Sequence, residues 1–194
     1  MDFGCFRQAV VAGSESNEVA NGAVLKLTDA ALAGELKARA DEIARIGGDA
    51  FEWGAVGPAL LTQFLRERSL LNQLAPAQDF YPIHWKRADW ALDPAKLEQA
   101  TALCQEAYVY HIWNEVLRDL RIPKNLMPPA GSFLHQRFIA VAPELAGLPT
   151  LPVETLRALV AHAGPPPEMG FIHHLRQLAP AAVKAVQKRF AGRR

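Results

Sequence analysis

The sequence is short of several features that would assign a protein to a class directly. It has only two cysteines, Cys5 and Cys104, with no C-x-x-C spacing, which argues against a disulfide scaffold and a structural zinc site. No apolar run approaches the roughly 20 residues that cross a bilayer, and the N-terminus lacks the pattern of a secretory signal. The 21 basic and 20 acidic residues nearly cancel, so we expect no nucleic-acid binder. Together these absences favour a reduced, cytoplasmic setting.

The hydrophobic pattern of the first part of the chain predicts a mixture of strands and helices. Residues 10–12 and 19–27 are typical of strands. A helix is predicted from Asp29 to Ile46 with Thr28 as its N-cap, and another begins at Gly57-Pro58 and ends near residue 68. Residues 80–85 favour a strand or turn, whereas 107–113 fit a strand or a helix equally.

The second part of the chain has a different character. Asp93-Pro94 opens a predicted helix that ends near residue 105, and a proline- and glycine-rich break follows residue 122. Helical stretches are expected at about 132–146, 153–163 and 168–190. We therefore expect an α/β domain over residues 1–121 and a helical C-terminal extension over 122–194.

Four short stretches occur in an order that points to a family. They are residues 19–25 (VANGAVL), 51–62 (FEWGAVGPALLT), 80–85 (FYPIHW) and 110–114 (YHIWN). In this order they resemble the C-terminal region of glycosyltransferases with a DXD motif, especially the family of the lactosylceramide α-1,4-galactosyltransferases. The last stretch departs from that family's HLWN signature only at Ile112, and Val56 replaces the threonine of its TGP signature.

The resemblance implies a fold, a reaction and a set of ligands. It implies the C-terminal portion of a GT-A-like domain that transfers a hexose from a nucleotide-sugar to a glycan or glycolipid, with retention of configuration, as in polysaccharide biosynthesis. Mn²⁺ or Mg²⁺ would neutralise the charge that develops on the leaving diphosphate. No residue of this chain can be named as nucleophile or base.

The resemblance also places individual residues, each with a structural alternative. His111 would contact the metal or diphosphate, with Trp113 and Asn114 beside it; the alternative is a core histidine. Asn21 would hydrogen-bond sugar hydroxyls and Gly22 would admit the ligand to the backbone, or the pair forms a plain turn between strands.

Two further features of the resemblance have structural alternatives. The helix that begins at Gly57-Pro58 would present N–H groups to the sugar or phosphate, or simply starts a helix. The aromatic side chains Trp53, Tyr81, Trp85 and Trp113 would stack on sugars or pack in the core.

One family motif is missing from the sequence. No Asp-x-Asp occurs anywhere, and the chain starts just past the point where that motif would stand. Without those carboxylates His111 has too few partners for a tight metal site, and the absent strands would leave an exposed sheet edge. We therefore predict weak or no catalysis by residues 1–194 alone. The alternative function is a truncated, non-catalytic remnant or interaction module that associates with itself or a partner.

The last predicted helix carries a cluster of positive charge. Five basic residues gather near its end: Lys184, Lys188, Arg189, Arg193 and Arg194. This helix could rest on an anionic membrane as a peripheral contact, or on an acidic partner. The alternative is that it packs on the parent domain with its basic face in solvent.

Overall fold

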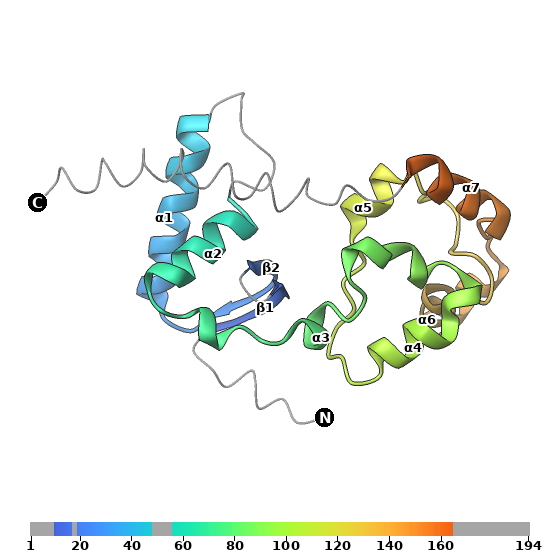
Figure 1. The fold of residues 1–194 in the computed structure, drawn as a ribbon, viewed down its shortest axis with the longest axis horizontal. Helices are drawn as coiled ribbons and strands as arrows, with labels where there is room; N and C mark the ends of the chain where they lie inside the picture. Colours follow the sequence, from blue (N-terminus) through green and yellow to red (C-terminus); the bar gives the residue numbers. More distant parts are fainter. Residues whose placement is uncertain (1–9, 17–18, 48–55, 165–194) are drawn as a thin grey trace, which may run out of the picture. The chain divides into compact units, whose positions relative to one another are not determined.

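The computed structural model describes residues 10–16, 19–47 and 56–164 (Figure 1). Contacts within the chain form two compact units, and the boundary between them falls between Ala77 and Gln78. The first unit is described up to residue 77 and the second from residue 78 to residue 164. Trp53, the predicted helix at 168–190 and its basic residues lie outside the described part of the chain.

The first unit contains a two-stranded antiparallel sheet. The strands are β1 (Val10–Ser16) and β2 (Val19–Leu27). Gly13 of β1 lies opposite Asn21 of β2, whereas the adjacent Ala12 lies opposite Leu25. Residues 22–24 of β2 therefore have no partner and form a bulge. On its other side, β1 exchanges two backbone hydrogen bonds of 2.9 Å with Ala75. This edge of β1 is thus covered at Ala75, while the exposed sheet edge expected from the absent strands stays a prediction.

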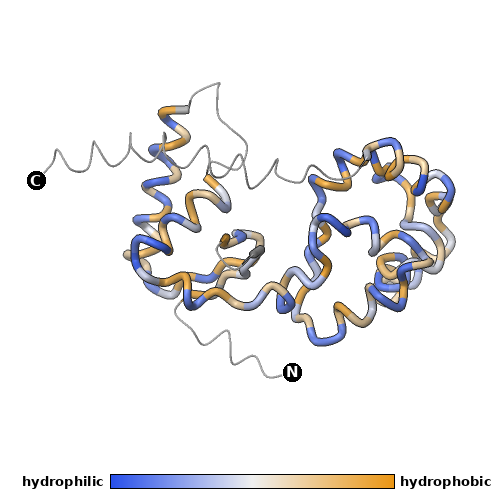
Figure 2. Tube along the Cα trace, in the orientation of Figure 1, coloured by the Kyte–Doolittle hydropathy of each residue, from blue (hydrophilic) through white to orange (hydrophobic). Residues whose placement is uncertain are grey.

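Two helices complete the first unit. Helix α1 (Ala30–Gly47) and helix α2 (Pro58–Glu67) alternate polar and apolar residues along their length (Figure 2). A short 3-10 helix, η3 (Leu71–Gln73), follows α2. The buried core joins the sheet to α2. The buried residues of this core are Val10, Ala12, Ala20, Leu61, Phe64 and Leu65.

A charged cluster joins α1 to the end of α2. Arg39 bonds to Glu67 at 2.6 Å and to Glu35 at 3.1 Å, and Arg68 also pairs with Glu35. The Arg68 guanidinium lies 3.7 Å from the centroid of the buried Phe64 ring. The carboxylates thus share two arginines, and hydrogen bonds from Arg68 lower the pKa of Glu35.

The second unit is built from short helices. In chain order they are α3 (Ala77–Phe80, which straddles the boundary), η4 (Trp85–Ala91), η5 (Pro94–Lys96), α4 (Leu97–Cys104), α5 (Asn114–Asp119), α6 (Phe133–Val141), η6 (Pro143–Gly147) and α7 (Val153–Ala163). Backbone bonds from Met127 N–H to Pro149 O and from Leu151 N–H to Met127 O, at 2.9 and 2.8 Å, join the segments that flank α6 and η6.

The α/β class is confirmed in its broad form, because the described residues are mostly helical with one small sheet. The predicted extension over 122–194 packs, as far as it is described, within the same unit as residues 78–121. Compact units need not follow family boundaries, so the division after residue 121 stays a prediction.

Two local predictions were wrong, the Thr28 N-cap and the choice of strand or helix for 107–113. Asp29 caps α1 in place of Thr28, since its Oδ1 accepts a hydrogen bond of 2.8 Å from Ala31 N–H. For 80–85, predicted as strand or turn, the strand is excluded: the chain bends between Phe80, which ends α3, and Trp85, which begins η4. Residues 107–113 are neither strand nor helix and precede α5 as irregular chain. Within the described residues, no helix combines the length and apolarity of a membrane span.

Substitution of Thr62 tests how α2 is fixed to the sheet. The buried Ala20 N–H donates to Thr62 Oγ1 at 2.9 Å. Thr62→Val keeps the shape but leaves this donor without a partner, so we expect a loss of about 1–3 kcal/mol in unfolding free energy. Thr62→Ser, which keeps the hydroxyl, should retain protection of the Ala20 amide in hydrogen exchange. Equal exchange rates in both variants would contradict this account.

Candidate functional site

Asn21 and Gly22 lie at the start of the bulge in β2. Asn21 is 9% exposed, and its Oδ1 accepts a hydrogen bond of 2.9 Å from Ala23 N–H. The amide therefore turns the backbone within the strand, and the expected alternative of a turn that joins two strands is wrong. Gly22 follows in the exposed part of the bulge, where an added Cβ would lie 3.8 Å from Leu61.

Gly57 and Pro58 begin α2 as predicted. Gly57 is the N-cap, Pro58 is the first helical residue, and Gly57 O accepts the first helical bond from Leu61 N–H at 3.0 Å. Because Leu61 also neighbours Gly22, the first turn of α2 and the bulge of β2 belong to one part of the first unit. The structure thus places Asn21-Gly22 and Gly57-Pro58, two of the predicted substrate contacts, in the same part of the first unit.

His111, Trp113 and Asn114 lie in the second unit, where α5 begins. Trp113 is the N-cap of α5 and adopts a left-handed backbone with φ of 54°, which costs a non-glycine residue about 1 kcal/mol. Its indole N–H donates to Ile83 O at 2.6 Å, and only 7% of the residue is exposed. Asn114 is the first residue of α5 and is exposed.

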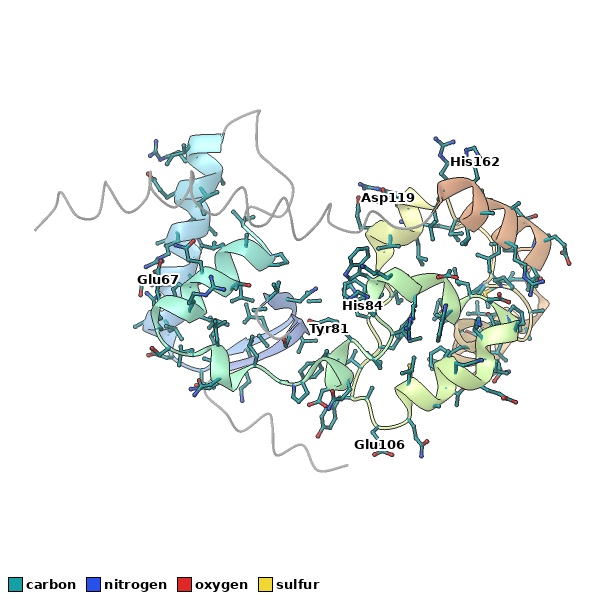
Figure 3. The ribbon with its side chains drawn as sticks, viewed as in Figure 1. Glu67, Tyr81, His84, Glu106, Asp119 and His162 are labelled. Carbon is teal, nitrogen blue, oxygen red and sulfur yellow. The ribbon has the colours of Figure 1, made fainter. Side chains whose placement is uncertain are left out.

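The His111 ring packs against two aromatic side chains. It makes edge contacts with Tyr81 and Trp113, at centroid distances of 5.5 and 4.4 Å. Tyr81, labelled in Figure 3 just after α3, is itself 4% exposed. We call His111, Tyr81 and Trp113 the aromatic cluster. Burial of Tyr81 and Trp113 supports the core alternative for their rings rather than sugar stacking.

The surroundings of His111 determine which ring nitrogen carries the proton of the neutral imidazole. Its Nδ1 accepts a hydrogen bond of 3.1 Å from Trp113 N–H, and burial holds its pKa below the ordinary value. A neutral imidazole whose Nδ1 accepts must carry its proton on Nε2. His111 therefore offers a hydrogen-bond donor at Nε2, whereas a metal ligand there would need the proton on Nδ1.

The described residues do not fit Mn²⁺ or Mg²⁺. These ions prefer several oxygen ligands, and no group of three His, Cys, Asp or Glu side chains occurs among the described residues. His111, the predicted metal contact, is occupied at Nδ1 and protonated at Nε2 in this arrangement. A metal would need ligands from beyond the described residues.

Sequence reasoning missed a partly buried polar cluster in the second unit, formed by Tyr110, Cys104 and Asp89. Burial raises the pKa of Tyr110, and the nearby Cys104 and Asp89 add to that shift. Burial likewise raises the pKa of the Cys104 thiol to about 11. Neither group is ionised near neutral pH, so neither supplies a nucleophile. The members of this cluster are separated in the sequence, so no local pattern showed it.

Comparison with known proteins identifies one segment of the chain. Residues 49–127 match the model of a family described as the alpha 1,4-glycosyltransferase conserved region. The predicted resemblance is confirmed for this segment. No curated protein and no solved structure matches the chain. The glycosyltransferase segment covers less than half of the chain. It includes Gly57-Pro58 and 111–114 but not Asn21 or Gly22.

The predicted convergence of these residues stays a prediction. Asn21, Gly22, Gly57 and Pro58 belong to the first unit, and His111 belongs to the second.

A pair of tryptophan substitutions tests the anchor of the glycosyltransferase segment. Trp113→Phe removes the bond to Ile83 O and leaves that carbonyl without its donor, so we expect a loss of about 1–3 kcal/mol beyond the change in ring size. Trp85→Phe is the control, because Trp85 Nε1 has no hydrogen-bond partner in the described structure. Urea denaturation followed by far-UV circular dichroism should show the larger loss for Trp113→Phe. Equal losses of unfolding free energy in the two variants would contradict a stabilising role for the hydrogen bond from Trp113 to Ile83 O.

Acid should destabilise the second unit through its histidines. Burial lowers the folded pKa values of His111 and His84 below the unfolded value of about 6.5. Between the folded and unfolded pKa values the unfolded chain binds more protons, so stability falls as pH falls below about 6.5. His111→Gln should reduce this dependence. An NMR titration that places the His111 pKa above 6.5, or its neutral proton on Nδ1, would overturn the assignment.

Proposed function

We propose that the chain acts as the C-terminal part of a GT-A-type glycosyltransferase. The intact domain would transfer a hexose from a UDP- or GDP-sugar to a glycan or glycolipid acceptor, with retention of configuration. The family match over residues 49–127 carries this proposal, because it supports glycosyltransferase function in general.

The reaction has one main electrostatic demand. The bond from the anomeric carbon to the diphosphate oxygen breaks, negative charge builds on the diphosphate, and the acceptor oxygen forms the new bond. His111 Nε2–H is a donor suited to a diphosphate oxygen, and Trp113 positions it by bonding to Nδ1. The residue that takes the acceptor's proton has no assignment among the described side chains.

The sugar pocket would be shaped by backbone in the first unit. Asn21 is a positioning residue in this proposal, because its Oδ1 already holds the bulge through Ala23 N–H. Gly22 and the first turn of α2, at Gly57-Pro58, would then present backbone groups to the hexose. Asn114, exposed at the start of α5, is the side chain near His111 that would meet a sugar hydroxyl.

The metal follows only from the family resemblance, and we propose Mn²⁺ or Mg²⁺ with ligands beyond the described residues. A cytoplasmic location is proposed from the composition, and peripheral membrane contact from the basic C-terminal residues. Self-association belongs to the alternative function, the non-catalytic interaction module.

Nucleotide binding tests the proposal. The melting temperature of the full chain should rise with UDP or GDP, and more so with Mn²⁺ or Mg²⁺, because a ligand that binds only the folded state stabilises it. His111→Gln should reduce that rise. Indifference to every nucleotide, together with self-association in sedimentation velocity, would instead favour a non-catalytic interaction module.

Gly22→Ala separates a ligand contact from a structural role. An added Cβ would make only an ordinary 3.8 Å contact with Leu61, so we expect the melting temperature without ligand to change little. The methyl group should nevertheless weaken UDP-hexose binding if the sugar approaches this backbone. Gly34→Ala, where no atom lies within 4 Å of the added Cβ, is the matched control. Equal binding by both variants would remove Gly22 from the pocket.

A further inference from the structure

The segment that begins η4 holds cations on aromatic rings. Lys86 Nζ lies 5.5 Å from the centroid of the Trp85 ring, and the Arg87 guanidinium lies 4.6 Å from that of Trp90. Lys96 Nζ lies 5.1 Å from the same Trp90 ring. We call Trp85, Lys86, Arg87, Trp90 and Lys96 the cation–indole patch.

Lys86 and Arg87 lie against indole rings, which do not neutralise their positive charge. Elsewhere in the described structure, Arg39, Arg68 and Arg118 form ion pairs with glutamates. Lys86 and Arg87 have no carboxylate within ion-pair distance in the described part of the chain, and an indole positions a cation without neutralising it. Their positive charge therefore remains for a ligand.

The neighbouring His84 lies within the field of both cations. Burial lowers the pKa of His84, and the nearby charges of Lys86 and Arg87 lower it further. His84 Nδ1 accepts a hydrogen bond of 3.2 Å from Lys86 N–H, so neutral His84 carries its proton on Nε2. His84, labelled in Figure 3, adds a third donor beside the two cations.

The acidic residues of the same stretch, Asp89 and Asp93, interact with groups other than Lys86 and Arg87. Asp93 pairs with Arg157 at 3.2 Å and caps Ala95 N–H at 3.0 Å. Asp89 is partly buried, which raises its pKa, and it interacts with Lys96. Lys96 is thus partly offset, and the effective positive charge lies at Lys86 and Arg87.

The composition of the patch suits a ligand that carries both acidic groups and sugar rings. Lys86 and Arg87 are adjacent in the chain, yet they lie on different indoles, and the backbone between Trp85 and Trp90 departs from helical geometry at Arg87. Lys86 and Arg87 are exposed, and both tryptophans are half-buried. Partly exposed aromatic rings beside cations combine an apolar surface for sugar rings with donors for acidic groups.

We propose that the cation–indole patch binds an acidic glycan, whose carboxylate groups contact His84, Lys86 and Arg87 while its sugar rings lie against Trp85 and Trp90. The identification of this glycan as the acceptor rests on the proposed glycosyltransferase function. The glycan-binding site itself does not. Nucleic acid is the less suitable polyanion, because the chain as a whole carries a net charge of only +1.

Titration of the full chain with two matched oligosaccharides tests the site. The probes are an oligogalacturonate hexasaccharide and the same oligosaccharide with its carboxylates reduced to alcohols. Calorimetry at low salt should show binding of the acidic form at least about tenfold tighter than of the neutral form. No binding, or equal binding of the two, would overturn the proposal, as would tighter binding of a single-stranded DNA oligonucleotide.

Two double variants control for net charge. K86Q/R87Q should weaken oligogalacturonate binding by about fivefold or more, since each exposed charge contributes modestly. R66Q/K124Q removes the same charge from exposed positions in α2 and after α5 and should change the affinity less than about twofold. If both double variants lost the same affinity for oligogalacturonate, binding would depend only on net charge, and the proposed site would be overturned.

A third variant and a separate assay isolate the cause. Trp90→Met keeps every charge but removes the ring under Arg87, and it should also weaken binding severalfold while the melting temperature confirms folding. Because donor is absent from these titrations, their failure leaves the nucleotide-binding test of the transferase proposal intact. Nucleotide binding that fails while oligogalacturonate binding survives would leave a glycan-binding module.

Discussion

The hydrogen bond from Trp113 Nε1 to Ile83 O joins the segment before η4 to the start of α5 within the second unit. It fixes the indole at the start of α5 and so supports the left-handed backbone that Trp113 adopts. That backbone directs the Trp113 N–H to His111 Nδ1, and the resulting bond decides where the imidazole keeps its proton. The chemical character of His111 is thus a consequence of a contact between residues that are 30 positions apart.

Regular periodicity and local capping rules predicted the larger elements well. Strand β2 and helix α7 have the expected bounds, and Gly57-Pro58 begins α2 because proline loses nothing at a first helical position. The irregular segments were less predictable. Residues 107–113 contain strand-forming side chains, but long-range contacts such as Tyr108 N–H with Asp79 O fix their path. Such tertiary contacts outweigh propensity in short segments.

The candidate site shows the same division between local and long-range information. The resemblance selected His111 from a stretch of five residues, and that stretch lies inside the segment that matches the family. The role of His111 stays a proposal. The direction of the His111 donor and the burial of Trp113 depend on packing with residues 81–83, which no local pattern specifies. The cation–indole patch was missed because its members are ordinary individually. Lys86 and Arg87 become informative only when the structure shows that they lie on indole rings and pair with no carboxylate among the described residues.

The central interaction of the proposed transferase lies in the second unit, where His111 Nε2–H is the candidate donor to the diphosphate. A structure of the chain with a UDP- or GDP-hexose bound tests this account most directly. The account predicts a diphosphate oxygen within hydrogen-bonding distance of His111 Nε2, with Trp113 N–H still on Nδ1. A nucleotide bound away from His111, or a metal on its Nε2, would contradict it.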